Sequence, residues 1–296
     1  MAYSQLAQSD HGLGFDDKAE QASVRVVALS DNLPTREKYV IAANHNVIMN
    51  DTAAAISAYE KLALGNPNDV DAQFALAGLY EQASNYDEAR KRLILVRSAD
   101  SKNVDALLAS GRVEIEAGNP QAGLEFLNSA YSLTTQFGNE ETKASVEIQL
   151  GHAYQTLNNL DEALKNYTGA LEIRKKLGLE KGVASCLNNI ARVQNRLGNY
   201  SEALANYKAS LAAYQHIGDS HGSAVILMNL GSFYADHAKY EDALKSTNDA
   251  LMLFRDLGEE ENQAQCLNNL GSIRSYMDNL QVRSLLTSRR IRFERN

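Results

Sequence analysis

The sequence predicts an all-α solenoid, because it repeats itself at fixed periods along almost its whole length. Gly138, Gly178, Gly218 and Gly258 stand forty residues apart, and the segments between them are similar, as in "ASCLNNIARVQNRLGNYSEAL" and "AVILMNLGSFYADHAKYEDAL". Only three prolines occur in 296 residues, which suits a nearly continuous run of helices. A unit of this length cannot bury its apolar face alone, so a core forms only when successive units stack.

A small residue marks the same place in each unit, at two different periods. The period is 34 residues in the first half and 40 in the second, as shown by Ala55, Ala89, Gly123, Ala163, Ala203 and Ala243. Upstream, a residue that is large except at Ser110 precedes a small one at Leu76-Ala77, Ser110-Gly111, Leu150-Gly151, Ile190-Ala191, Leu230-Gly231 and Leu270-Gly271. We expect two helices to cross closely at these small residues, since a larger side chain would hold their backbones apart.

The repeats predict about eight helix-turn-helix units in three segments. Residues 1–137 hold units of the 34-residue type, the first of them truncated, and residues 138–280 hold units of the 40-residue type. Residues 281–296 form a divergent basic C-terminal helix or frayed end. The units begin near Met1, Arg36, Val70, Val104, Ala144, Ala184, Ala224 and Ala264.

The ends of several helices can be predicted in chain order. Pro67 closes the second unit, because proline cannot continue a helix, and the acidic pair Asp161-Glu162 suits the start of a second helix. Gly178 and Gly218 are placed to end helices in the left-handed conformation that glycine adopts without strain. We expect the six extra residues of the longer period to lengthen the second helix and its turn.

An aromatic residue follows the small one by three positions in the clearest units, at Tyr80, Tyr154 and Tyr234. With the 34-residue spacing, this pattern resembles the tetratricopeptide repeat over nearly the whole chain. The resemblance implies a right-handed superhelix of antiparallel helix pairs, in which the first helix of each pair, helix A, lines a concave groove and the second is helix B.

The first third resembles a narrower group of proteins. The segment "LSDNLPTREKYVIAANHNVIMNDTAAAISAYEKLALGNPND" is similar to the repeat tails of bacterial eukaryotic-like serine/threonine kinases. The resemblance implies a signalling context, with an attached or partner signalling domain. The sequence has no glycine-rich loop, HRD or DFG motif, so kinase activity is not implied.

Composition limits the partners of the chain. A net charge of −8 and a pI near 5.3 argue against a nucleic-acid partner. No run of 18 apolar residues is present, and the N-terminus has neither a basic flank nor an apolar stretch. We therefore expect a cytoplasmic protein without a membrane span.

No residue pattern predicts a metal, a cofactor or an active site. Cys186 and Cys266 lie two whole units apart, too far for a disulfide, and suit buried positions. His216, Asp219 and His221 surround one turn without a further ligand at a useful spacing. Gly12-Leu13-Gly14 lacks the third glycine of a phosphate-binding loop. We expect a non-enzymatic protein.

One feature points to binding. An amide side chain precedes the large-small pair in each 40-residue unit, and asparagine is a mediocre helix former, so its recurrence needs a reason. These asparagines resemble those with which kinesin-light-chain-like arrays hold the backbone of an extended peptide, and an amide both donates and accepts. The alternative is that the amides satisfy helix ends or face water. The candidate groove residues are Gln149, His152, Asn188, Asn189, Arg192, Arg196, Asn229, Asn268 and Asn269.

The first half of the chain and its C-terminal segment do not carry these amides. The first half carries Ile41, Ala75 and Ala109 at the amide position, which indicates another face or no peptide contact there. In residues 281–296, five arginines accompany one glutamate, and the segment suits a solvating cap, a frayed end or a basic arm.

The sequence therefore favours a protein–protein interaction scaffold that binds a peptide or protein segment in its groove. One alternative is a sensor or regulatory segment of a larger bacterial signalling protein. Another is a repeat protein of the response-regulator phosphatase type, for which Gln149 and Gln155 are the only candidates to position a water.

Overall fold

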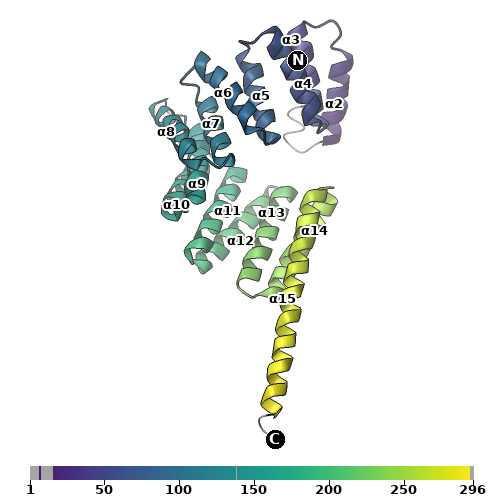
Figure 1. Cartoon of the computed structure of the whole chain (residues 1–296), viewed down its shortest axis with the longest axis vertical. Coiled ribbons are helices and arrows are strands. Elements are labelled where there is room, and N and C mark those ends of the chain that lie inside the picture. Colours follow the sequence, from purple (N-terminus) through teal and green to yellow (C-terminus); the bar gives the residue numbers. More distant parts are fainter. Residues whose placement is uncertain (1–6, 8–15, 138, 294–296) are drawn as a thin grey trace. The chain divides into compact units, whose positions relative to one another are not determined.

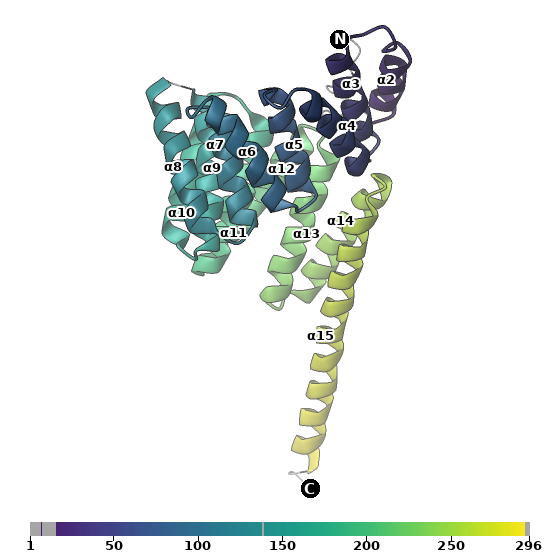
Figure 2. The same ribbon diagram turned by 45° about the horizontal axis from the view of Figure 1, so that its top comes forward.

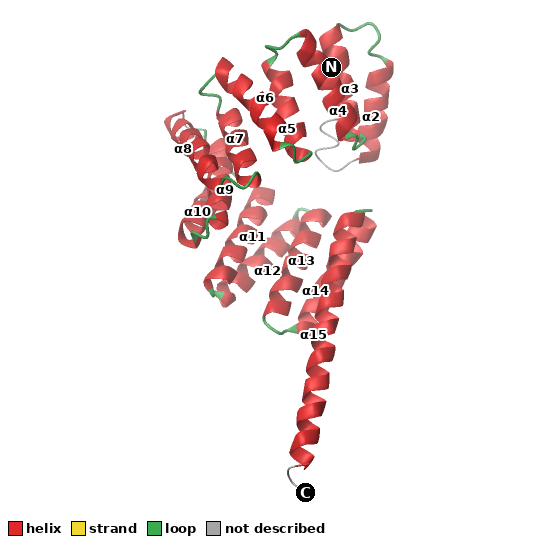
Figure 3. Ribbon diagram, viewed as in Figure 1, coloured by secondary structure: helices red, strands yellow, loops and turns green. Residues whose placement is uncertain are grey.

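The computed structural model describes residues 7, 16–137 and 139–293, with side chains for residues 7, 18–137 and 139–278. In this part of the chain all regular elements are α-helices, and fourteen of them, α2 to α15, follow one another in antiparallel pairs (Figure 1, Figure 3). The predicted all-α solenoid is confirmed. The chain divides into two compact units, unit 1 (Met1–Asn139) and unit 2 (Glu140–Asn296).

Unit 1 contains seven of the described helices, and each packs mainly on its neighbours in sequence. Its complete pairs are α3 with α4, α5 with α6, and α7 with α8, and α2 packs on α3. The helices are α2 (Asp16–Ala28), α3 (Thr35–Ile48), α4 (Thr52–Gly65), α5 (Val70–Gln82), α6 (Tyr86–Ala99), α7 (Val104–Glu116) and α8 (Pro120–Phe137).

Unit 2 repeats the arrangement with longer helices. Its pairs are α9 with α10, α11 with α12, and α13 with α14, and Figure 2 shows the packing of α15 along α14. The helices are α9 (Glu140–Thr156), α10 (Leu160–Lys176), α11 (Glu180–Leu197), α12 (Tyr200–His216), α13 (Ser220–Asp236), α14 (Tyr240–Asp256) and α15 (Glu260–Phe293).

The number of helix pairs and the lengths of the helices refine the sequence prediction. Within the described ranges, six complete pairs stand between α2 and α15, which lie at the places of the first and eighth predicted units. The expectation that the longer period lengthens only helix B and its turn is wrong. Helix A grows from 13 residues in α5 to 17 in α9, and helix B from 14 in α6 to 17 in α10, so both helices share the added turn.

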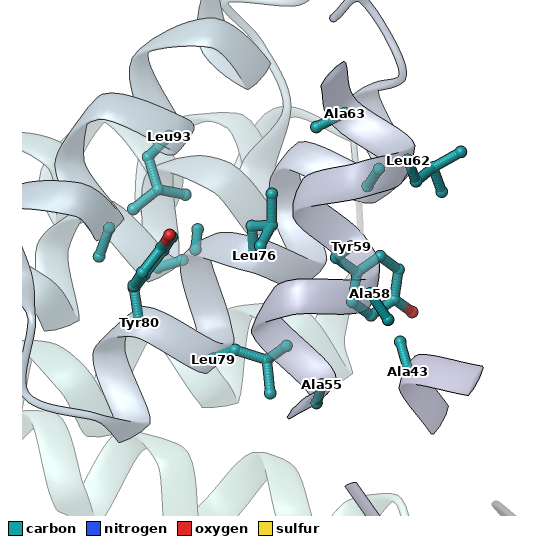
Figure 4. Close-up of a cluster of buried hydrophobic side chains, with 14 of the residues drawn as sticks. Ala43, Ala55, Ala58, Tyr59, Leu62, Ala63, Leu76, Leu79, Tyr80 and Leu93 are labelled. Carbon is teal, nitrogen blue, oxygen red and sulfur yellow. The ribbon is translucent and has the colours of Figure 1, made fainter. Parts of the chain in front are cut away.

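The small residues lie where the two helices of a pair cross, as predicted. Ala55, Ala89, Ala163, Ala203 and Ala243 are all completely buried. A Cβ atom added to Gly151 would lie 2.6 Å from Cε1 of Tyr167, so only glycine fits beneath that ring. In unit 1, Leu76 and Tyr80 of α5 and Leu93 of α6 belong to one buried cluster that continues into α4 (Figure 4).

The helix ends follow local chemistry. Asp69 caps α5 by accepting from the Ala72 N–H at 3.1 Å, and Asp219 caps α13 from the Gly222 N–H at 2.7 Å. Gly178 and Gly218 have φ values of 70° and 73°, which confirms that each helix ends in the left-handed conformation. Gly138 lies outside the described residues. None of the helices in the described ranges is both long and apolar enough to cross a bilayer.

Candidate peptide-binding face

The candidate residues lie on the helix A members of unit 2, namely α9, α11, α13 and α15, and we call this surface the helix-A face. Two sets of hydrogen bonds join its neighbouring helices. Asn229 Nδ2 donates to Asn188 Oδ1 at 3.0 Å, between α13 and α11. Arg196 of α11 donates to the Gln155 backbone oxygen at 3.1 Å and to Asn158 Oδ1 at 2.7 Å. The face is therefore continuous from α9 to α13.

The four amides at the repeated position differ in burial. Asn189 is buried, with 7% of its surface exposed, while Gln149, Asn229 and Asn269 are half-buried. The bond across the face runs from Asn229 to Asn188, one position away from the predicted ladder. An asparagine amide has two donors and an acceptor with two lone pairs, so this bond uses only part of its capacity. Asn268 of α15 is exposed.

His152 is held as a neutral imidazole. It lies with its ring edge-on to that of Tyr167, with centroids 5.6 Å apart and planes at 68°. Burial lowers the pKa of His152, and the nearby Arg192 guanidinium lowers it further. A neutral imidazole has one N–H donor and one nitrogen acceptor, so at neutral pH His152 resembles the amides around it.

The two arginines of α11 have different surroundings. Arg192 is exposed and lies near enough to Tyr167 and Tyr207 to act on both phenols by its charge. Arg196 is also exposed, but its guanidinium holds the carbonyl of Gln155 and the side chain of Asn158 at the turn after α9. Arg192 is thus the better placed of the two to meet an acidic ligand, whereas Arg196 caps a helix end.

Other candidate residues have structural partners. Gln155 Oε1 accepts from the Tyr167 hydroxyl at 3.1 Å. Asp219 caps α13 and pairs with Lys181 Nζ at 2.9 Å, and His221 Nδ1 lies 2.7 Å from Glu259 Oε1. Within the described ranges, no three His, Cys, Asp or Glu side chains gather closely enough to hold a metal ion.

Both cysteines are buried and unbridged, as the sequence predicted. Burial raises the pKa of the Cys186 thiol to about 11, so the thiolate is scarce at neutral pH. Cys186 therefore behaves as a small apolar residue of the core.

Two polar contacts that join successive helix pairs of unit 2 were not predicted from the sequence. Lys181 pairs with Asp219, and His221 lies against Glu259, so both contacts join residues 38 apart. The signal was present as a basic residue near the start of helix A and an acidic one just before the next helix A. It becomes visible only once the helix starts are known, because the spacing is two residues shorter than the repeat.

The equivalent helices of unit 1 are joined by ion pairs instead of amides. Arg36 Nε lies 2.6 Å from Asp69 Oδ2, and Arg112 pairs with Glu81 between α7 and α5. The hydrogen bond from Arg36 holds the pKa of the Asp69 carboxyl below its ordinary value. Ile41 and Ala109, which stand at the amide position, are buried. Unit 1 therefore carries no row of amides at that position.

Solved structures of low sequence identity share the fold. A Rap protein complexed with competence and sporulation factor has a TM-score of 0.67 at 13% identity, over 97% of this chain and 87% of that one. A STAND protein with a tetratricopeptide repeat sensor from Pyrococcus horikoshii has 0.64 at 16%, over 85% and 42%. BtubC (BKLC) from P. vanneervenii has 0.54 at 20%, over 75% and 89%.

Comparison of sequences identifies the repeats themselves. No curated protein matches the chain. Two family models, both described as tetratricopeptide repeat, match residues 47–111 in unit 1 and residues 142–216 in unit 2. These segments include the whole helix pairs α5–α6 and α11–α12, which have the antiparallel packing and small crossing residues described above. Each of the two units therefore contains a segment that matches the tetratricopeptide repeat.

Proposed function

We propose that unit 2 is a non-catalytic protein-binding module that holds an extended peptide segment on its helix-A face. The observation that carries this proposal is the hydrogen bond between Asn188 and Asn229, which fixes two amides on adjacent helices with donors and acceptors still to offer. Amides in a row bind the main chain of a peptide, which has the same groups in every sequence. Arg192 adds a preference for acidic side chains.

Asn229 and Asn269 are the two residues to change. Both are half-buried rather than buried, so alanine at these positions leaves the helix pairs intact. Two lost hydrogen bonds, each of about 0.5–1.5 kcal/mol, predict an affinity decrease of roughly 5- to 150-fold. The matched control is Asn248→Ala, because Asn248 is an exposed asparagine on helix B of the same unit, with its amide on the Leu244 carbonyl.

The experiment selects peptides from a random phage-displayed library on the whole chain and titrates the winners by fluorescence anisotropy. We expect the double variant Asn229→Ala with Asn269→Ala to bind them more weakly, and Asn248→Ala to bind as the unchanged chain does. Circular dichroism checks that all three proteins are equally helical. Equal binding by the double variant would remove the helix-A face as the binding surface.

A second candidate function is that of a sensor or regulatory segment attached to a signalling domain. It is supported by the STAND protein from Pyrococcus horikoshii, in which a repeat sensor is part of a larger chain. The match covers 42% of that chain. Sequencing the gene on both sides of this segment distinguishes the two candidates. An adjoining enzymatic domain favours the sensor, and a gene that ends with these repeats favours the scaffold.

A third candidate, the response-regulator phosphatase type, is the weakest. It requires a glutamine side chain that is able to position a water molecule. Gln155 already accepts from the Tyr167 hydroxyl, and Gln149 is half-buried on α9. We also propose a cytoplasmic location, from the lack of a long apolar run in the sequence, and a bacterial signalling role, from the resemblance of the first third to kinase repeat tails.

A further inference from the structure

The last helix pair of unit 2 is incomplete in the part of the chain that the structure describes. In earlier pairs, the glycine of helix A is covered by its helix B: a Cβ added to Gly151 would meet the Tyr167 ring, and one added to Gly111 would lie 2.5 Å from Leu127 Cγ. Gly271 of α15 occupies the equivalent position, and no described atom lies within 4 Å of the Cβ built there. The face that receives a helix in the preceding pairs is therefore open in α15.

A hollow of about 560 Å³ lies on this open face, and six residues of α15 line it. Leu267 and Tyr276 at its two ends are 51% and 61% exposed, although Leu187, the equivalent of Leu267, is half-buried against a hydrophobic cluster of α9, α10 and α11. The lining residues are Leu267, Asn268, Gly271, Ser272, Ser275 and Tyr276. They form two rows along the helix with a spacing of four residues, and none is charged.

The chemistry of these six residues is symmetric about a point between Gly271 and Ser272. Moving outward in both directions, a small residue comes first, then a hydrogen-bonding residue (Asn268 or Ser275), then a large one (Leu267 or Tyr276). Two copies of the helix laid antiparallel across this point place large against large, amide against hydroxyl, and glycine against serine. An isologous contact about a two-fold axis requires this kind of self-complementarity.

We propose that two copies of this chain associate through an antiparallel crossing of their α15 helices at Gly271. Rows with a four-residue spacing on both helices interdigitate at a crossing angle near 50° in magnitude, and glycine at the crossing lets the backbones approach closely. Asn268 of one copy then hydrogen-bonds Ser275 of the other, while Leu267 covers the Tyr276 ring. The contact continues the helix A–helix B packing of the preceding pairs with a helix from the second copy.

A contact around one crossing point is small beside most specific interfaces, so we expect a dimer that forms in the micromolar range. Sedimentation velocity from about 1 to 300 μM tests this expectation over the range in which such a contact would form. The sedimentation coefficient should rise with concentration toward that of a dimer. A chain that stays monomeric over the whole range would overturn the proposal, whatever else covers the open face.

Gly271→Glu is the variant that separates dimerisation from folding. Because the space around Gly271 is open, the new side chain does not disturb the monomer, but it places a charge at the crossing. We expect this variant to stay monomeric at every concentration. Gly78→Glu is the matched control, since Gly78 lies within α5 of unit 1 with open space at its Cβ and should leave dimerisation unchanged. A Gly271→Glu chain that still dimerises would rule out this surface.

Cysteine cross-linking tests the antiparallel register. Ser272→Cys lies beside the two-fold axis, so this variant should form an intermolecular disulfide on oxidation. Asn268→Cys should not cross-link with itself, because the two thiols stand about 10 Å apart along the helices. A mixture of Asn268→Cys and Ser275→Cys chains should cross-link, since these positions face each other. Equal yields for all pairings would contradict the proposed register.

Discussion

At the scale of single residues, one turn position recurs with different side chains. The backbone is left-handed after helix A in six successive pairs, at Asn50, Ser84, Gly118, Asn158, Gly198 and Ala238. Glycine and asparagine adopt this conformation readily, whereas alanine is strained by its Cβ. Ala238, with φ of 55°, is therefore the least suited residue of the set.

We predict that Ala238→Gly stabilises the protein by about 1 kcal/mol, because the strain of a left-handed alanine exceeds the entropy that glycine loses on folding. Urea unfolding followed by circular dichroism measures the change. The control is Ala212→Gly, at an exposed position within α12, which should destabilise by about 0.5–1 kcal/mol. If both substitutions changed the free energy of unfolding in the same direction, the backbone strain assigned to Ala238 would be contradicted.

His152 gives a pH dependence of stability. Its pKa in the folded protein is below its ordinary value because of burial and of Arg192, so folding opposes protonation. The contribution of neutral His152 to the free energy of unfolding is complete at pH values above the unfolded pKa of about 6.5. It is lost as the pH falls through the pKa of the folded protein. We predict a lower free energy of unfolding at pH 5.5 than at pH 7.5, and a smaller difference in His152→Gln.

The control for this measurement is His216→Gln, on the exposed last turn of α12. It should leave the difference between the two pH values unchanged. If His152→Gln loses as much stability on acidification as the unchanged chain, the dependence comes from other groups.

On the helix-A face, the sequence predicted which helix carries each amide but not its hydrogen-bond partner. The repeat correctly placed Asn189 and Asn229 on helix A, but the observed partner of Asn229 is Asn188, 41 residues away rather than 40. Neighbouring helices that cross at an angle bring positions together that are offset from the repeat. The capping bonds of Arg196 were missed for a related reason, because they depend on where α9 ends.

At the scale of the helix pair, stability depends on the glycine at the crossing. We predict that Gly151→Ala destabilises the protein by roughly 1–3 kcal/mol, since its Cβ would lie 2.6 Å from the Tyr167 ring, which is completely buried. Gly271→Ala, at the equivalent but open position, should stabilise it by about 0.5–1 kcal/mol through higher helix propensity.

Urea unfolding of both variants, at concentrations low enough to avoid association, measures these opposite effects. Destabilisation of similar size by both would mean that Gly271 is covered in solution even in the monomer. That outcome would also weaken the proposed dimer contact.

Helix lengths could be predicted less well than helix pairing. The 40-residue period showed that six residues are added to each unit, but it did not locate them. Both helices gain about one turn, because their flanking segments, such as Glu140–Lys143 before Ala144, also form helix. Pairing depends on the small crossing residues, which the repeat places directly, whereas a helix end depends on a few local capping contacts.

At the scale of the whole molecule, the fold class followed from periodicity alone. The chain divides between Asn139 and Glu140, and the two units have separate buried clusters such as those around Leu76 and Tyr167. The function could not be predicted equally well, since binding depends on which exposed side chains of the repeats meet a partner. Core positions are set by packing, but exposed positions on the same helices are not.

The near-uniform lengths of the six helices from α9 to α14, at 17 or 18 residues, make unit 2 modular. A block such as residues 180–219 starts and ends at the same point of the repeat. Duplicating or deleting such a block in the gene would create only junctions of a kind already present. Evolution, or an engineer, can thus adjust the reach of the amide row by one copy at a time without redesigning any contact.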